Sequence, residues 1–197
     1  MTLQVPERTQ DSYRPDTIVR LFVVDSRSAS FYGGDSKFTR AMREAFAAVR
    51  GPDVPTGHAF LDYFRRDGNW VWDLPDSPSK MPGAVGKNPS RAARCAPRLA
   101  DLLRESSPRW MIAVQATLDD ILQEAAFQAG LSPKRVQILP FPLHYWIGEF
   151  TQRLAALLRR ESQADGPFPP MPIEEAIRRA LQAVGSQAPA REVANEL

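Results

Sequence analysis

Residues 18–46, with the sequence IVRLFVVDSRSASFYGGDSKFTRAMREAF, decide the fold of this chain. They begin with an apolar, β-branched run at residues 18–24, which is typical of a strand buried on both faces. A short polar segment that contains Asp25 follows this run. Apolar residues then recur at the spacing of a helix, for which Ser36 is the expected N-cap: Phe38, Met42, Ala45 and Phe46. Because ligands of open α/β sheets bind beyond the carboxyl ends of the strands, we expect function in the loop after this strand.

Composition sets broad limits on the class of protein. The chain has 197 residues, 43% of them hydrophobic and 24% charged, which is typical of one globular domain. Its 25 positive and 23 negative side chains leave a net charge of +2, which permits a polyanionic partner without requiring one. One cysteine excludes an internal disulfide, and two distant histidines do not have the spacing of a zinc site. No apolar run is long enough to span a membrane and no signal peptide is recognisable, so we predict a cytoplasmic protein without membrane association.

Strand-like and helix-like segments alternate along the rest of the chain. Three further strands are expected at residues 70–74, 110–115 and 135–139, and five further helices at 58–66, 90–105, 119–129, 144–161 and 173–184. This alternation predicts a three-layer α/β/α domain around a mainly parallel, four-stranded sheet. We expect an irregular lead-in at residues 1–17, the α/β/α domain at 18–162, and at 163–197 a proline-rich linker with an amphipathic helix packed on the same domain.

Unusual residues follow three of the four expected strands. Asp25 and Ser26 follow the first, Asp73 ends the second, and residues 139–144 (LPFPLH) follow the fourth. Their order and spacing resemble the uracil-DNA glycosylase superfamily, above all the branch whose first motif reads Gly-Glu-Ala-Pro. Residues 24–27 stand where this motif would be. Residues 139–144 look like the second motif, His-Pro-Ser-Pro-Leu-Ser.

The resemblance extends over roughly residues 18–160, and within it residues 94–99 look like the helix that follows the second-strand loop in that family. It implies hydrolysis of the N-glycosidic bond of a deaminated or damaged base in DNA, without a metal or an organic cofactor. It places Asp25, Ser26 and His144 in a catalytic group, in which Asp25 would hold the attacking water.

A base-binding group and a DNA-binding group follow from the same resemblance. Phe31 would stack on the extruded base and Asp73 would read its edge, with Phe141 close by. Leu143 would enter the duplex as an apolar wedge. The other expected DNA contacts are Arg27, Lys80, Lys87, Arg91, Pro140 and Pro142.

Five residues depart from the pattern of the family, and two of them are Ser26 and Arg27, which stand where Ala-Pro is usual. Leu139 replaces the motif-two histidine, Phe141 replaces the following serine, and Asp73 stands where a base-reading asparagine is usual. A carboxylate at that place would repel O4 of uracil but accept hydrogen bonds from an exocyclic amine, which favours another base or a loss of catalysis.

Other interpretations of these residues remain open. The chain could be an inactive member that binds nucleic acid or a protein, with the C-terminal helix contacting a partner or a second copy. It could also be an unrelated small-molecule enzyme that uses the same crevice. Structural roles are open as well, because Asp25 could be a turn residue, Phe31 could belong to the core, and Asp73 could cap a loop. Tyr145 and Trp146 could belong to the core or staple the following helix.

Overall fold

Four parallel strands form the centre of the molecule. The computed structural model describes residues 10–25, 28–74, 89–143 and 145–163, with the backbone alone at residues 28, 89–93, 162 and 163. The strands pair in the order β2-β1-β3-β4. Their bounds are Arg20–Val24 for β1, Asn69–Asp73 for β2, Trp110–Ala113 for β3 and Val136–Ile138 for β4. The register pairs Val24 with Asp73 and Val23 with Ala113, so the carboxyl ends of the strands meet at one edge of the sheet.

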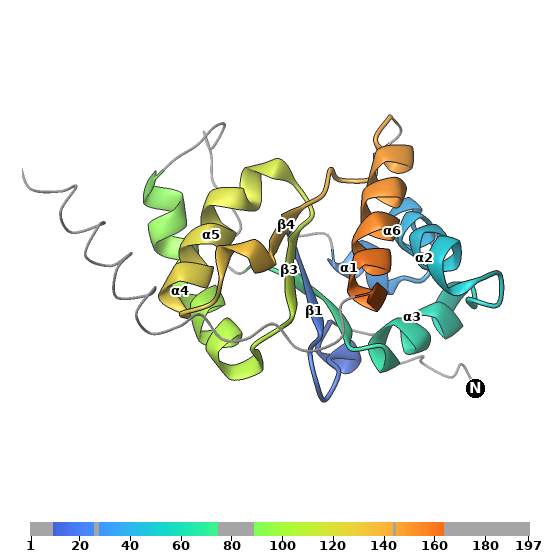
Figure 1. Ribbon diagram of the computed structural model, residues 1–197, viewed down its shortest axis with the longest axis horizontal. Helices are drawn as coiled ribbons and strands as arrows, with labels where there is room; N and C mark the ends of the chain where they lie inside the picture. Colours follow the sequence, from blue (N-terminus) through green and yellow to red (C-terminus); the bar gives the residue numbers. More distant parts are fainter. Residues whose placement is uncertain (1–9, 26–27, 75–88, 144, 164–197) are drawn as a thin grey trace, which may run out of the picture.

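Helices cover both faces of the sheet (Figure 1). The face to the right in Figure 1 carries α1 (Ser28–Tyr32), α2 (Lys37–Arg50), α3 (Gly57–Arg66) and α6 (Ile147–Gln163). The other face carries α4 (Pro89–Ser106) and α5 (Asp119–Gln128). The expected three-layer α/β/α fold is therefore confirmed. Within the described residues, no helix is both long and apolar enough to cross a membrane.

Aromatic side chains fill the space between the sheet and the layer that contains α2. Phe22 of β1 lies 5.6 Å from Phe64 of α3, measured between ring centroids, and Phe31 lies 5.1 Å from the same ring. All four apolar residues of β1 are buried, as expected for a central strand between two helical layers. The N-cap of α2 is confirmed, because the Thr39 amide donates to Ser36 Oγ at 3.0 Å.

One element of this layer was not predicted. The segment after β1, expected to be a loop, contains the short helix α1, which turns the aromatic rings of Phe31 and Tyr32 into the core. Its small flanking residues show no helical periodicity, and burial of the two rings stabilises the helical turn. Gly34 follows α1 with a φ of +87°, and a Cβ there would approach the His58 ring to 3.0 Å, so glycine suits this position.

Tyr32 and Gln10 close the outer edge of β2, which is an edge strand of the sheet. The Tyr32 hydroxyl donates to the Val71 carbonyl at 2.9 Å and accepts from the Val71 amide at 3.0 Å. The Asp73 amide donates to Gln10 Oε1 at 2.9 Å, from the 3₁₀ turn η1 (Gln10–Tyr13). Tyr13 stacks on Tyr32 at 4.9 Å. These contacts satisfy backbone groups that an open strand edge would leave exposed.

Replacing Tyr32 by phenylalanine is expected to lower the free energy of unfolding at pH 7 by about 1–3 kcal/mol, because the buried Val71 amide loses its acceptor. Burial raises the pKa of Tyr32 well above its usual value near 10, against the opposing effect of the Val71 hydrogen bond, and the charge of Asp73 adds to the increase. The folded state therefore favours the neutral hydroxyl, and this stabilisation is complete below pH 10 and lost as the pH rises further.

Urea denaturation between pH 7 and pH 11 measures both effects. Above pH 10 the wild type should lose stability more steeply than Tyr32→Phe, by about 1.4 kcal/mol per pH unit. Parallel pH profiles of the two proteins would show that the hydroxyl is not held as described.

A buried ion network occupies the opposite, amino edge of the sheet. Arg20 is 3% exposed, and its Nε donates to Glu161 Oε2 at 2.5 Å. Its Nη1 donates to Asp67 Oδ2 at 2.9 Å and to Asn69 Oδ1 at 2.8 Å. Arg109 Nε lies 3.8 Å from Glu161 Oε1. The network joins β1 to the end of α6 and to the turn before β2, so it fixes the amino edge of the domain.

Candidate functional site at the carboxyl edge of the sheet

The connections that leave the neighbouring strands β1 and β3 run to opposite faces of the sheet. The chain leaves β1 toward the face covered by α1, α2 and α3, and it leaves β3 toward the face covered by α5 (Figure 1). In open α/β sheets, the loops that separate at such a point leave a crevice that binds ligands. The first residues beyond β1 and β3 are therefore the first candidates for a site.

Two carboxylates lie at this edge. Asp25 directly follows β1 and is 8% exposed. Asp73 is the last residue of β2, is half-buried, and pairs in register with Val24, the residue before Asp25. The sheet thus brings the predicted water-holding acid and the predicted base-reading acid to neighbouring strand ends.

Gln115 is a third polar residue at this edge, and sequence reasoning did not select it. The Val114 amide donates to the Val23 carbonyl at 3.0 Å, so the pairing of the two chain segments continues one residue beyond β3, and Asp25 and Gln115 are the next residues of these two segments. Gln115 is half-buried, and its Oε1 accepts from Thr117 Oγ1 at 3.4 Å. A polar residue directly after a buried strand, as at Asp25, would have indicated Gln115. The strand was predicted to extend to residue 115, so Gln115 was counted as part of the strand.

The aromatic residues predicted to bind a base pack in the core instead. Phe31 is fully buried between Phe38 and Phe64, with centroid distances of 5.2 Å and 5.1 Å. In this conformation neither face of its ring is open to a ligand, which agrees with the core interpretation. Phe141 is half-buried, and its ring packs against that of Phe38 at a tilt of 47°, with the centroids 5.4 Å apart.

The segment between β4 and α6 changes from buried to exposed along its length. Leu139 is buried and its amide donates to the Ala113 carbonyl at 2.8 Å. Pro140 is half-buried and Pro142 is buried, whereas Leu143 is 51% exposed. Of these expected DNA contacts, Leu143 is therefore the most accessible.

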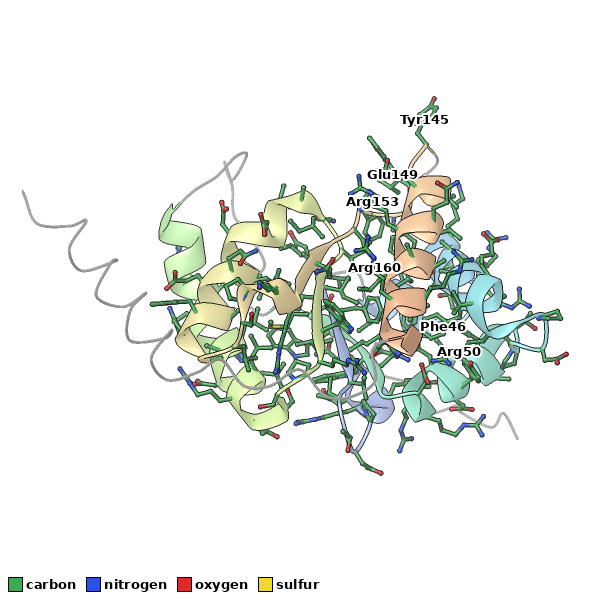
Figure 2. All side chains as sticks on the ribbon, in the orientation of Figure 1. Phe46, Arg50, Tyr145, Glu149, Arg153 and Arg160 are labelled. Carbon is green, nitrogen blue, oxygen red and sulfur yellow. The ribbon has the colours of Figure 1, made fainter. Side chains whose placement is uncertain are left out.

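Tyr145 and Trp146 are exposed and do not belong to the core. Tyr145 is 97% exposed and Trp146 is 52% exposed. Figure 2 shows Tyr145 projecting from the end of the molecule at which α6 begins, away from the body of the domain. Because the segment follows β4, this exposed group lies on the same side of the domain as the strand ends that carry Asp25 and Asp73.

Several predicted site residues lie outside the described part of the chain. These are Ser26, Arg27, Lys80, Lys87 and His144, together with the side chain of Arg91 and the predicted helix at residues 173–184. Among the residues that are described, no group of three His, Cys, Asp or Glu side chains is arranged to hold a metal ion.

Cavities elsewhere are lined by different chemistry. An open cavity of about 650 Å³ lies at the amino edge, lined by side chains of both charges that include Asp62, Arg65 and Asp67. A smaller one of about 190 Å³ lies between α2 and the start of α3. The larger cavity lies at the amino edge of the sheet, whereas Asp25 lies at the carboxyl edge, so this cavity is not part of the candidate site.

The fold and this edge define an open, all-parallel α/β protein with three layers and polar residues at its topological switch point. No model of a known protein family matches the chain. No curated protein matches it either. The functional argument therefore depends on the chemistry of the edge itself.

Proposed function

We propose that the protein binds DNA at the carboxyl edge of its sheet and hydrolyses the N-glycosidic bond of a deaminated or damaged base. One observation carries the proposal: the carboxylate of Asp25 lies at a strand end on the same side of the domain as the exposed side chains of Leu143, Tyr145 and Trp146. An enzyme that acts on a base in duplex DNA must extrude it, and an apolar side chain such as Leu143 can occupy the vacated position in the stack.

The reaction assigned to this edge needs only water as a second reactant. The bond between C1′ of the sugar and the nitrogen of the base breaks, and its electron pair leaves with the base. The water oxygen bonds to C1′ while Asp25 accepts a proton from that water; the departing base takes up one proton from solvent, and Asp25 then returns its proton to solvent. A carboxylate also stabilises the positive charge that develops on the sugar.

Charge supports a polyanionic partner. Helix α2 carries four basic and one acidic side chain, and α6 carries three basic and two acidic ones, which together give +4. Helices α4 and α5 carry four basic and five acidic side chains, which give −1. Helix α2 begins at the carboxyl edge, because Phe38 in its first turn contacts Phe141. The helical layer with the positive net charge, which contains α2 and α6, is thus the layer next to the exposed side chains of Leu143, Tyr145 and Trp146.

A second candidate function is nucleic-acid binding without cleavage. The complete burial of Phe31 and the burial of Leu139, where the uracil-DNA glycosylase superfamily has a histidine, favour it. In that case the edge would retain its affinity for DNA and lack both the stacking ring and the donor that meets the charge on the leaving base.

Affinity for DNA is expected to fall linearly with salt on a double-logarithmic plot, because each phosphate contact releases counterions. Replacing the exposed Arg40 of α2 by glutamate should weaken binding and reduce the magnitude of this salt slope by about 1. Fluorescence anisotropy of a labelled duplex, titrated at several salt concentrations, measures both quantities.

Arg98→Glu provides the matched control, since Arg98 is an exposed arginine of the opposite layer. It should leave the slope unchanged. No binding by the wild type, or an equal effect of the two substitutions, would contradict an interface on the α2–α6 side.

A further inference from the structure

Exposed apolar side chains gather at one point of the described molecule. Four large hydrophobic residues are exposed in the described parts of the chain, and three of them are Leu143, Tyr145 and Trp146. The fourth, Phe127 of α5, is 43% exposed and lies in the other helical layer. The Tyr145 side chain is 97% exposed and therefore contributes little to the packing of the domain, and a cluster of exposed apolar side chains marks a contact site for a partner.

The backbone that presents these rings is held in place from both sides. The Leu143 amide donates to the Phe141 carbonyl at 2.7 Å, and the Trp146 amide donates to the Leu143 carbonyl at 2.6 Å. The Phe150 amide donates to the Trp146 carbonyl at 2.8 Å, which joins the turn to α6. Such anchoring reduces the conformational entropy lost on binding.

We propose that Tyr145 and Trp146 form a stacking platform for unpaired nucleobases, so that the protein binds single-stranded DNA in preference to duplex. The proposal rests on the DNA-binding function above and deepens it by naming the form of the substrate. Flat aromatic rings gain affinity by stacking on any base, and a base in a duplex is already stacked between its neighbours. Leu143 alone would suit a wedge, whereas two adjacent exposed rings offer surfaces on which successive bases can stack.

The charges on α6 agree with a strand that continues from the platform along the helix. Arg153, Arg159 and Arg160 are exposed on α6, while Glu149 is paired with Arg153 at 2.5 Å and Glu161 is buried in the network of Arg20. Figure 2 shows Glu149 and Arg153 on the first half of α6 and Arg160 nearer its end. Because Glu149 neutralises Arg153, the net exposed charge of α6 is carried by Arg159 and Arg160, and these side chains can contact phosphates of a strand whose bases stack at the platform.

Anisotropy titrations of the full chain with labelled oligothymidylate and with a duplex of equal length test the proposal. The wild type should bind the single strand more tightly at the same salt concentration. Tyr145→Ala and Trp146→Ala should each weaken single-strand binding by roughly 5-fold to 100-fold and change duplex binding much less. Because the Tyr145 side chain is 97% exposed, Tyr145→Ala should leave the melting temperature unchanged.

Phe127→Ala is the matched control and should bind both probes as the wild type does. Wild-type affinity in a double variant that combines Tyr145→Ala with Trp146→Ala, or a preference for the duplex, would overturn the platform while leaving DNA binding intact. Failure of the wild type to bind either probe would overturn both the platform and the proposed function. Concentration-dependent self-association that Tyr145→Ala abolishes, without an effect of this substitution on DNA binding, would show that a second copy covers these rings.

Discussion

Replacing Arg20 by methionine is expected to lower the free energy of unfolding by about 3–5 kcal/mol, the largest effect on stability that we predict. Arg20 contributes hydrogen bonds to Glu161, Asp67 and Asn69. Without the guanidinium, the Glu161 carboxylate remains buried and loses its hydrogen bond from Arg20, while Arg109 Nε stays 3.8 Å away. Removing one partner of a buried pair costs more than the pair contributes, because the other charge stays desolvated.

Urea denaturation followed by circular dichroism measures this loss. Arg104→Met is the control, because Arg104 forms an ion pair with Asp101 on the exposed surface of α4 and should lose less than about 1 kcal/mol. The double variant Arg20→Met with Glu161→Met should be more stable than Arg20→Met alone, since it removes the stranded charge. A loss below about 1 kcal/mol for Arg20→Met would mean that the network adds little to the fold.

Replacing Asp25 by asparagine is expected to reduce base excision by at least about 100-fold while leaving the melting temperature nearly unchanged. Asparagine keeps the shape of the side chain but cannot accept the proton of the attacking water. The measurement is the rate of abasic-site formation under single-turnover conditions. DNA affinity should be retained, because the substitution removes a negative charge from the edge.

Asp16→Asn is the matched control for this prediction, since Asp16 is an exposed acid near the amino edge. It should excise bases at the wild-type rate. A large fall in the melting temperature of Asp25→Asn would instead assign Asp25 a structural role, and unchanged excision would remove it from the mechanism.

The layered fold was predictable because it depends on local patterns. The short apolar runs around Phe22 and Ile112 are bounded by polar or turn residues, and each lies within one or two residues of its expected place. Ser36 capped the expected helix because a serine before a helical pattern supplies the missing acceptor. The parallel direction of the strands was predictable from their alternation with helices.

The features that sequence reasoning missed depend on contacts between distant residues. Gln10 covers Asp73 of β2, and Arg20 reaches Glu161, across separations of 63 and 141 residues. No local pattern reports such pairings. Arg20 lies within an apolar run, and an arginine in such a run indicates a buried charge that has a partner elsewhere in the chain. Only the fold identifies that partner as Glu161.

The candidate site was predictable in position more than in detail. Strand ends located Asp25 and Asp73 at the same edge, because register and parallel pairing determine which residues meet there. The exposure of Tyr145 and Trp146 and the burial of Phe31 depend on how α6 and α1 pack, and aromatic residues are consistent with either environment in the sequence.

An excision assay on a panel of oligonucleotides tests the central claim most directly. Purified protein would be incubated with labelled single-stranded and duplex substrates that contain uracil, hypoxanthine or xanthine, and abasic sites would be converted to strand breaks with alkali. We predict strand breaks with at least one substrate, and none with Asp25→Asn. If the wild type produces no strand break on any substrate, the hydrolytic function assigned to this edge is wrong.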